Sequence, residues 1–446
     1  MRRIYLLIVC FSLSLMLFAQ NEKKEEQLIK KNWNFGALPT ITFDTDLGFQ
    51  YGALVNLYDY GDGTRYPKYN HSLYFEVSRF TKGSGINRFY YDSDELIKGL
   101  QTSFDLSYLS DQAYDFYGFN GYDAVYQPDW IDTESGYYKT RMFYKYDRKL
   151  FRMKVDLQGK LVGDRFRWIS GFNLQNFKIG KIDRDKLNKG KKGKDILPDV
   201  AGLYERYQQW GVISAEEANG GFVPTVKAGA VYDSRDNRPN PMKGVWTEAV
   251  LEGAPQFLGA ESSFLKLSLI HREYFTLVPK KLSFVYRLAY QTTLAGKTPF
   301  YYESQVITSV LTGALSEGLG GAKTLRGVLR NRVVGDGFFY GNTEMRWKVT
   351  RFNWINNNFY IGLNAFVDFG KVTKKIQTDF KYTGPTGFYS TDPNYNKPNG
   401  EKMHYSFGSG LRVVMNENFV IAADYGMATN EQDGTSGMYI GLNYLF

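Results

Sequence analysis

Polar and apolar side chains alternate along segments of about ten residues, and this repeat limits the fold more than any other feature of the sequence. Between Ser283 and Gln291 every second residue is large and apolar: Phe284, Tyr286, Leu288 and Tyr290. Successive side chains of a β-strand point to opposite faces, so such a segment predicts a strand with one apolar and one polar face. The same alternation recurs in 342–349, 361–370 and 404–413.

Sixteen such segments follow one another, separated by turns rich in Gly, Asn, Asp or Lys. They are 36–43, 48–58, 71–82, 87–94, 101–110, 139–158, 165–180, 222–233, 245–253, 262–277, 282–295, 342–352, 359–371, 404–415, 419–428 and 438–446. Alternate connections are short, as at 279–281 and 416–418, whereas the opposite ones are long: 112–139, 181–221, 296–341 and 373–403. Short turns on one side and long loops on the other are typical of a bacterial outer-membrane barrel.

No apolar run of about 18 residues follows the first 20 residues, so no membrane-spanning helix is predicted. A strand in lipid must pair its backbone groups with neighbouring strands, and a closed barrel achieves this. Aromatic residues make up 17% of the chain and mean hydropathy is -0.39, as aromatic girdles around a polar lumen require. The sequence therefore predicts an all-β fold, a transmembrane antiparallel β-barrel of sixteen strands.

The first residues predict export. Residues 1–19 have the pattern of a cleaved signal peptide, with Arg2 and Arg3 before the apolar run from Ile4 to Phe18. Residues 20–34 form a short charged lead on the periplasmic side, and 35–446 form the barrel domain. Cys10 is the only cysteine and lies in the signal, so the mature chain is expected to hold no disulfide and no cysteine metal site.

The net charge of +9 does not predict nucleic-acid binding, because an exported chain is not expected to meet nucleic acid. The basic cluster 181–194 has two interpretations: a solvated external loop, or a surface that contacts anionic lipopolysaccharide.

A glycine-rich loop with one arginine precedes two strand segments that each carry a carboxylate. The loop is 318–328 and contains Arg326 and Gly327. The first strand contributes Glu344, and the second contributes Asp368, which is followed two residues later by Gly370. The alternation places both carboxylates on the lumen face. A guanidinium can share its donors between two carboxylates, so the pattern predicts an ion-paired loop inside the barrel.

These motifs together resemble the outer-membrane assembly and surface-antigen superfamily, which includes BamA, TamA and the two-partner secretion transporters. The resemblance implies sixteen strands and a sixth external loop folded back into the lumen, with Arg326 contacting strands twelve and thirteen. The turn residues Asp233, Arg235, Asp236, Pro241 and Gly244 resemble a periplasmic turn of that family. Tyr444 and Phe446, on the apolar face of 438–446, resemble its C-terminal assembly signal, and a chain ending there is expected to close its barrel.

The sequence departs from the family at two places. Val328 replaces an aromatic residue of the loop motif, and 20–33 is too short for the periplasmic POTRA domains that receive client proteins. A separate periplasmic or membrane protein is therefore an expected partner. Other expected partners are outer-membrane lipid, lipopolysaccharide and the machinery that inserts the barrel.

The expected function is outer-membrane biogenesis by insertion or translocation of proteins or lipids, through a weak seam between the first and last strands. The alternatives are a passive pore and a barrel lipase using His404 and Ser406. The paired loop is either a fixed anchor or a latch that moves during translocation. The 233–244 segment is expected to form a turn rather than a calcium site, and no cofactor, metal ligand or catalytic residue is predicted.

Overall fold

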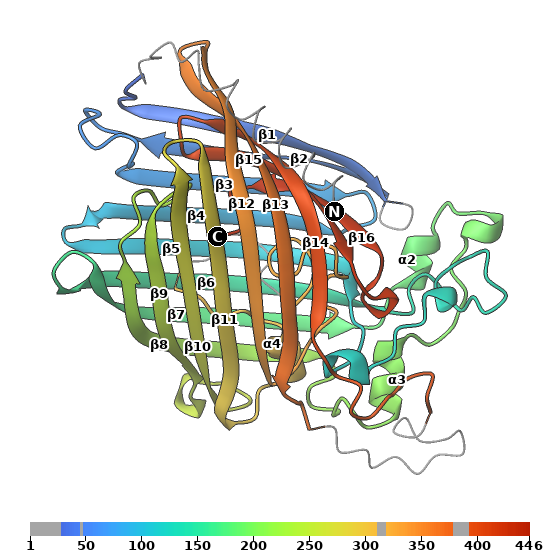
Figure 1. Ribbon diagram of the computed structural model, residues 1–446. Helices are drawn as coiled ribbons and strands as arrows, with labels where there is room; N and C mark the ends of the chain where they lie inside the picture. Colours follow the sequence, from blue (N-terminus) through green and yellow to red (C-terminus); the bar gives the residue numbers. More distant parts are fainter. Residues whose placement is uncertain (1–27, 45–47, 310–317, 378–391) are drawn as a thin grey trace, which may run out of the picture.

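The computed structural model describes residues 28–44, 48–309, 318–377 and 392–446, so the predicted signal peptide lies outside the described residues. It contains one antiparallel sheet in which each strand pairs with its neighbours in the chain, in the order β1 to β16 (Figure 1). The strands are β1 Trp33–Asp44, β2 Gly48–Asp59, β3 His71–Phe80, β4 Gly85–Ile97, β5 Leu100–Asp115, β6 Lys145–Val162, β7 Phe166–Gly180, β8 Gly220–Asp233, β9 Gly244–Ala254, β10 Phe264–Val278, β11 Leu282–Gly296, β12 Gly337–Trp354, β13 Asn357–Lys374, β14 His404–Met415, β15 Phe419–Ala428 and β16 Ser436–Leu442. The prediction of sixteen antiparallel strands is confirmed.

The helices are short and lie in the connections. They are α2 Arg184–Asn188, α3 Leu203–Gln209, α4 Phe300–Glu303 and the 3-10 turns η1 Gly121–Asp123, η2 Pro128–Trp130, η3 Gly193–Asp195, η4 Gln256–Leu258 and η5 Glu431–Asp433. Among the described residues, no helix is long and apolar enough to cross a membrane.

The two faces of the sheet differ as the alternation predicts. Outward side chains such as Leu288, Leu363 and Phe407 are apolar and exposed, as a surface in contact with lipid requires. Inward side chains such as Arg287 and Asn364 are polar and buried. The interior of the sheet is therefore a polar lumen filled by side chains and loops.

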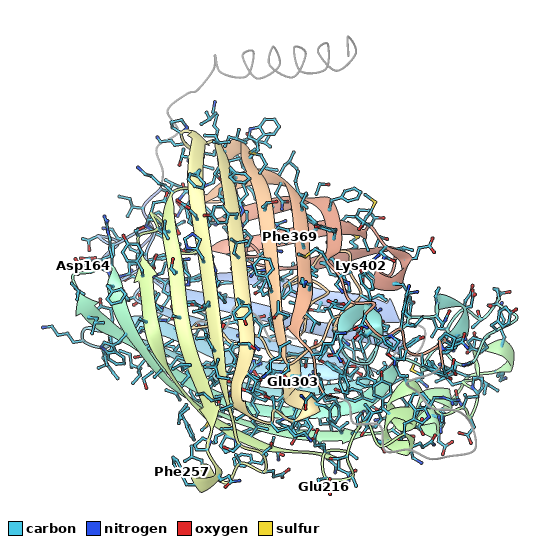
Figure 2. All side chains as sticks on the ribbon, turned by 60° about the horizontal axis from the view of Figure 1, so that its bottom comes forward. Asp164, Glu216, Phe257, Glu303, Phe369 and Lys402 are labelled. Atoms are coloured by element: carbon cyan, nitrogen blue, oxygen red, sulfur yellow. The ribbon has the colours of Figure 1, made fainter. Side chains whose placement is uncertain are left out.

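The long connections gather at one end of the sheet, beside α2 and α3, and most of the turns at the other end are short (Figure 1). Figure 2 shows Asp164, in the β6–β7 turn, far from Lys402, in the β13–β14 connection. In outer-membrane barrels the long loops are external and the short turns periplasmic, and we name the two ends of the sheet accordingly.

The external loops build an aromatic cluster that covers their end of the lumen. Phe116, in the β5–β6 connection, packs edge-on against Tyr207 of α3 at 5.2 Å and Phe300 of α4 at 6.4 Å. This packing explains why β6 begins at Lys145 rather than at 139, as predicted: Phe143 and Tyr144 belong to the cluster and are buried in it.

The sheet does not close into a complete cylinder, which corrects the expectation of a closed barrel. Among the described residues β1 pairs only with β2, and β16 only with β15. We call the gap between β1 and β16 the seam. Its periplasmic end is bridged: the ring of Phe419 occupies the space beside Gly36, where a Cβ would lie 2.4 Å away, and Asn418 donates to the Tyr60 hydroxyl at 2.8 Å.

The expected strand 438–446 is wrong in its second half. Strand β16 ends at Leu442, Asn443 takes a left-handed φ of 69°, and Tyr444 and Phe446 are buried. Their rings lie over the guanidinium of Arg346, at 4.5 and 4.8 Å. The chain turns inward because these aromatic rings meet a cation on the lumen face, which an outward strand would not allow.

Candidate functional site

The connection between β11 and β12 is described over residues 297–309 and 318–336; these two parts enter the lumen, and we call them loop 6. Leu319 and Val333 pair with each other through an antiparallel bridge and are fully buried. Together with Leu325 and Val328 they pack on Tyr340 of β12 in one apolar cluster. Val328, which replaces the expected aromatic residue, thus helps to pack loop 6 against the barrel wall.

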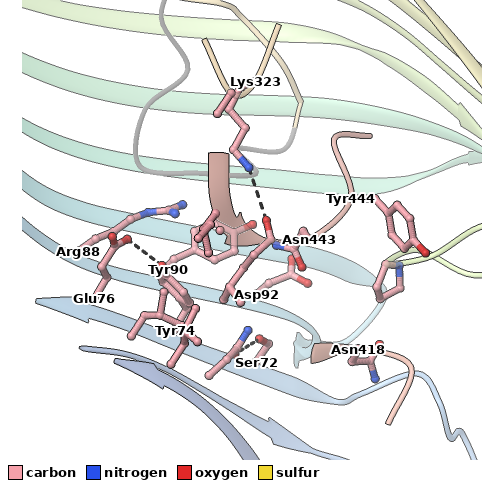
Figure 3. A pocket seen from close by; sticks show the side chains of 18 of the residues that line it. Ser72, Tyr74, Glu76, Arg88, Tyr90, Asp92, Lys323, Asn418, Asn443 and Tyr444 are labelled. Carbon is pink, nitrogen blue, oxygen red and sulfur yellow. Dashed lines mark hydrogen bonds between the residues drawn. The ribbon is translucent and has the colours of Figure 1, made fainter. Parts of the chain in front are cut away.

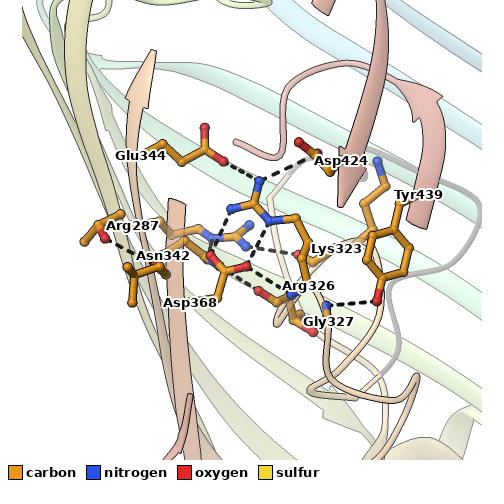
Figure 4. Close-up of polar contacts among 12 residues, drawn as sticks. Arg287, Lys323, Arg326, Gly327, Asn342, Glu344, Asp368, Asp424 and Tyr439 are labelled. Atoms are coloured by element: carbon orange, nitrogen blue, oxygen red, sulfur yellow. Dashed lines mark hydrogen bonds and ion pairs between the residues drawn. The ribbon is translucent and has the colours of Figure 1, made fainter. Parts of the chain in front are cut away.

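Arg326 joins loop 6 to the barrel wall (Figure 4). Its Nε donates to Asp368 Oδ2 at 2.9 Å and its Nη2 to Asp368 Oδ1 at 2.9 Å, a bidentate contact with β13. Its Nη1 forms an ion pair with Glu344 Oε1 of β12 at 2.6 Å. All three side chains are fully buried. We call these three residues, together with Gly327 and Gly370, the loop lock.

Four contacts of the loop lock were not predicted from the sequence. Asp424 of β15 lies 3.6 Å from Arg326 Nη1, and the ring of Phe366 lies 3.4 Å from the guanidinium carbon. The Tyr439 hydroxyl of β16 accepts from the backbone N–H of Gly327 at 3.0 Å, and Arg346 Nε donates to Glu344 Oε2 at 2.6 Å. Alternation alone places Asp424 and Tyr439 on the lumen face, but not opposite the loop. The loop lock therefore reaches from β12 to β16, beside the seam.

Gly327 and Gly370 leave room for close contacts rather than supplying chemistry. Gly327 has a φ of 95°, and a Cβ there would lie 2.6 Å from the backbone of Gly426 on β15. At Gly370 a Cβ would lie 3.1 Å from the side chain of Leu319 in loop 6. Both glycines allow backbone and wall to approach within a distance that a side chain would prevent.

The predicted periplasmic turn lies between β8 and β9. Arg235 Nε donates to Asp233 Oδ1 at 2.9 Å, and Asp236 Oδ1 accepts from the backbone N–H of Met242 at 3.0 Å. Gly244 has a φ of 110° and Pro241 is buried. These contacts occupy the carboxylates within the turn itself, as the turn interpretation expects.

A cavity of about 860 Å³ lies at the seam and opens into the lumen (Figure 3). Its rim is apolar, with Leu38 and Ile41 from β1 and Met438, Ile440 and Leu442 from β16. Its interior is polar, with side chains from β3 and β4, from the β8–β9 turn and from loop 6. We call it the seam cavity.

His404 and Ser406, the residues of the lipase alternative, do not form a hydrogen bond with each other. The His404 imidazole contacts Asp433 Oδ1 through Nδ1 at 2.7 Å and Glu401 Oε2 through Nε2 at 3.3 Å. The Tyr122 ring stacks on it at 3.8 Å. The Ser406 hydroxyl is buried without a hydrogen-bond partner among the described residues. The histidine thus joins external loops and does not activate this serine.

Several solved structures resemble this chain. BamA from Haemophilus ducreyi lacking POTRA domains 1-3 is 14% identical with a TM-score of 0.47, covering 93% of this chain and 69% of that one. CdiB from Escherichia coli is 9% identical with a TM-score of 0.50, covering 92% and 61%. CdiB from Acinetobacter baumannii is 12% identical with a TM-score of 0.41, covering 93% and 60%. At these identities the likeness concerns the fold alone. No curated protein sequence matches the chain.

The sequence profile of the Omp85 superfamily domain matches residues 66–446. This range begins in the β2–β3 connection and holds the fourteen strands β3 to β16, with loop 6 and the loop lock.

 The match confirms the resemblance that the motifs predict. This chain belongs to the Omp85 superfamily of outer-membrane β-barrels.

Proposed function

We propose that this protein acts in outer-membrane biogenesis, by inserting or translocating proteins or lipids through the seam between β1 and β16. The observation that carries the proposal is that, within the described part of the chain, β1 and β16 each have one unpaired edge in an otherwise continuous sheet. An unpaired edge presents free N–H and C=O groups, to which an incoming strand can add. The apolar rim of the seam cavity lets the opening meet the lipid.

The loop lock supports this proposal as a positional device. Its bidentate contact fixes the orientation of Arg326, and the cost of burying the charges offsets much of their attraction, so position rather than stability is its main contribution. Because the N–H of Gly327 donates to Tyr439 of β16, the loop also holds one side of the seam. We infer that a shift of loop 6 would change how freely β16 can move.

The passive-pore alternative gains no support from the lumen. Loop 6 crosses it, and the aromatic cluster covers its external end. We further propose that residues 1–19 direct export, that the barrel machinery inserts the chain, and that a separate periplasmic or membrane protein delivers the client.

Cross-linking the seam tests the proposal. The variant carries Ile41→Cys and Ile440→Cys, two exposed outward residues on β1 and β16, joined by a cleavable bismaleimide. Its control carries Leu363→Cys and Leu411→Cys, which face each other on the paired strands β13 and β14. We expect the cross-linked seam to reproduce the effect of depletion, measured as loss of other barrel proteins or of lipid asymmetry, and cleavage to reverse it.

Two results would contradict the proposal. One is full activity of the cross-linked seam variant. The other is a depletion that lowers solute conductance and leaves outer-membrane proteins and lipids unchanged, which would favour the pore.

A further inference from the structure

The seam cavity has an excess of positive charge. Five cationic side chains line it and only two carboxylates do, Glu76 and Asp92. The cations are Arg88, Arg235, Arg238, Arg272 and Lys323. Both carboxylates are engaged by neutral donors, since Tyr74 donates to Glu76 and Tyr69 to Asp92, each at 2.7 Å. Among the described residues neither carboxylate forms an ion pair with a cation of the lining, and five cations against two carboxylates leave an excess of positive charge.

Two of the five cations form ion pairs with carboxylates that do not line the cavity. Arg88 donates to Asp105 at 2.7 Å, and Arg235 donates to Asp233 at 2.9 Å. These pairs belong to the wall and the periplasmic turn. The remaining three cations, Arg238, Arg272 and Lys323, have no carboxylate within ion-pair distance in the described part of the chain.

Arg272 is the most informative of these three. It lies on β10, is only 8% exposed, and its Nε is buried with no hydrogen-bond partner among the described residues. Its guanidinium carbon lies 5.8 Å from the centre of the Trp246 ring. A buried guanidinium without an anion is costly, so a native protein retains one where an anion comes to it.

Lys323 approaches the cavity from the opposite side. It lies on loop 6, three residues before Arg326. Among the described residues, the one hydrogen bond of its ammonium is a long contact of 3.5 Å with the carbonyl of Leu442 on β16 (Figure 3). The cavity thus has cations on the wall and on the loop, and an apolar rim that faces the membrane. A ligand that fits both must carry an anionic group and an apolar chain.

We propose that the seam cavity binds an amphiphile with a phosphate headgroup, held by Arg272 and Lys323 with its acyl chain between β1 and β16. A guanidinium binds phosphate oxygens through two parallel hydrogen bonds, and an ammonium adds a point charge. The cavity volume of about 860 Å³ is within the range of small-molecule sites, about 300–1,000 Å³. The inference names a substrate class for the seam and rests on the proposed function.

Native mass spectrometry of the purified full chain in a neutral detergent tests the binding. The probes are phosphatidylglycerol, a diacylglycerol with the same chains but no phosphate, lipid A, and inorganic phosphate. We expect phosphatidylglycerol or lipid A to bind and diacylglycerol and inorganic phosphate to bind far more weakly. Preference between the first two identifies the source of the phosphate, a glycerophospholipid or a phosphorylated glycolipid.

Variants locate the site. Removal of both charges by Arg272→Gln and Lys323→Gln is expected to raise the apparent Kd for the preferred lipid about tenfold or more, since hydrogen bonds to charged groups are the stronger ones. Arg272→Lys keeps the charge and should retain most of the binding. Lys154→Gln is the matched control, because Lys154 is a buried lumen cation that does not line the cavity.

Three results would overturn the inference. They are equal binding of the anionic lipid and diacylglycerol, equal binding by the wild type and the double variant, and binding of an amphipathic β-strand peptide where no lipid binds. The first comparison uses the wild type alone, so it stands even if a variant fails to fold. A chain that binds no anionic lipid, yet loses activity when its seam is cross-linked, would refute the lipid site and leave the proposed function intact.

Discussion

Arg326 fixes the position of loop 6, because its guanidinium forms ion pairs with Glu344 and Asp368 on two neighbouring strands. Truncating it would leave both buried carboxylates without this partner. We expect Arg326→Ala to lower the free energy of unfolding by about 3–5 kcal/mol and to make loop 6 more susceptible to limited proteolysis.

Arg351→Ala is the control for this prediction. Arg351 pairs with Glu417 at 3.1 Å but is 42% exposed, and a surface pair contributes about 0–1 kcal/mol. Equal proteolysis and equal thermal stability of the two variants would show that Arg326 does not hold the loop.

At this scale the sequence predicted Glu344 and Asp368 because strand alternation fixes which face a side chain occupies. It did not predict Asp424, Phe366 or Tyr439 as neighbours of the loop. Which inward residue lies opposite the loop depends on the stagger of the strands around the barrel, and alternation within one strand carries no information on stagger.

At the periplasmic end of the seam, β1 contacts β15 through Gly36 and the ring of Phe419. We expect Gly36→Val to displace the ring of Phe419 and to lower stability by about 1–3 kcal/mol, as overpacking does. Phe419→Ala should remove the clash, so that the double variant is more stable than the two single effects predict. Thermal unfolding of the four proteins measures the coupling, and simple additivity would contradict the contact.

The elements themselves could largely be predicted from the sequence. The last strand could not, because the apolar face of 438–446 continues unbroken through Tyr444 and Phe446 while the cation that turns them inward, Arg346, lies on β12. For the same reason closure of the sheet was wrongly expected: strand pairing at the seam depends on contacts between the two ends of the chain.

For the whole molecule, His404 joins the external loops to one another. Its ring contacts Asp433 and Glu401, and Tyr122 both stacks on it and donates to Asp433 at 2.5 Å. Three external connections, β5–β6, β13–β14 and β15–β16, thus meet at one imidazole. Arg332 of loop 6 adds the fourth, since it donates to the carbonyl of Gly121 at 2.9 Å.

We expect His404→Ala to loosen this junction by about 1–3 kcal/mol, because buried carboxylates lose a donor. Hydrogen exchange of the Tyr122 and Leu329 amides, which donate to Glu401 and to the carbonyl of Asp433, measures the effect. His71→Ala, on β3, is the matched histidine control. Unchanged exchange in His404→Ala would show that the loops hold together without the imidazole.

Strand β16 shares seven paired residues with β15, whereas β1 shares twelve with β2. The ladder is therefore shortest at the C-terminal end of the sheet. When the protein is pulled from that end, we expect β16 to detach first and at the lowest force, before any hairpin yields. In single-molecule force spectroscopy this would give a small first peak, absent when the Ile41→Cys and Ile440→Cys pair is cross-linked. The wall of this barrel thus has a built-in order of rupture, beginning at the seam.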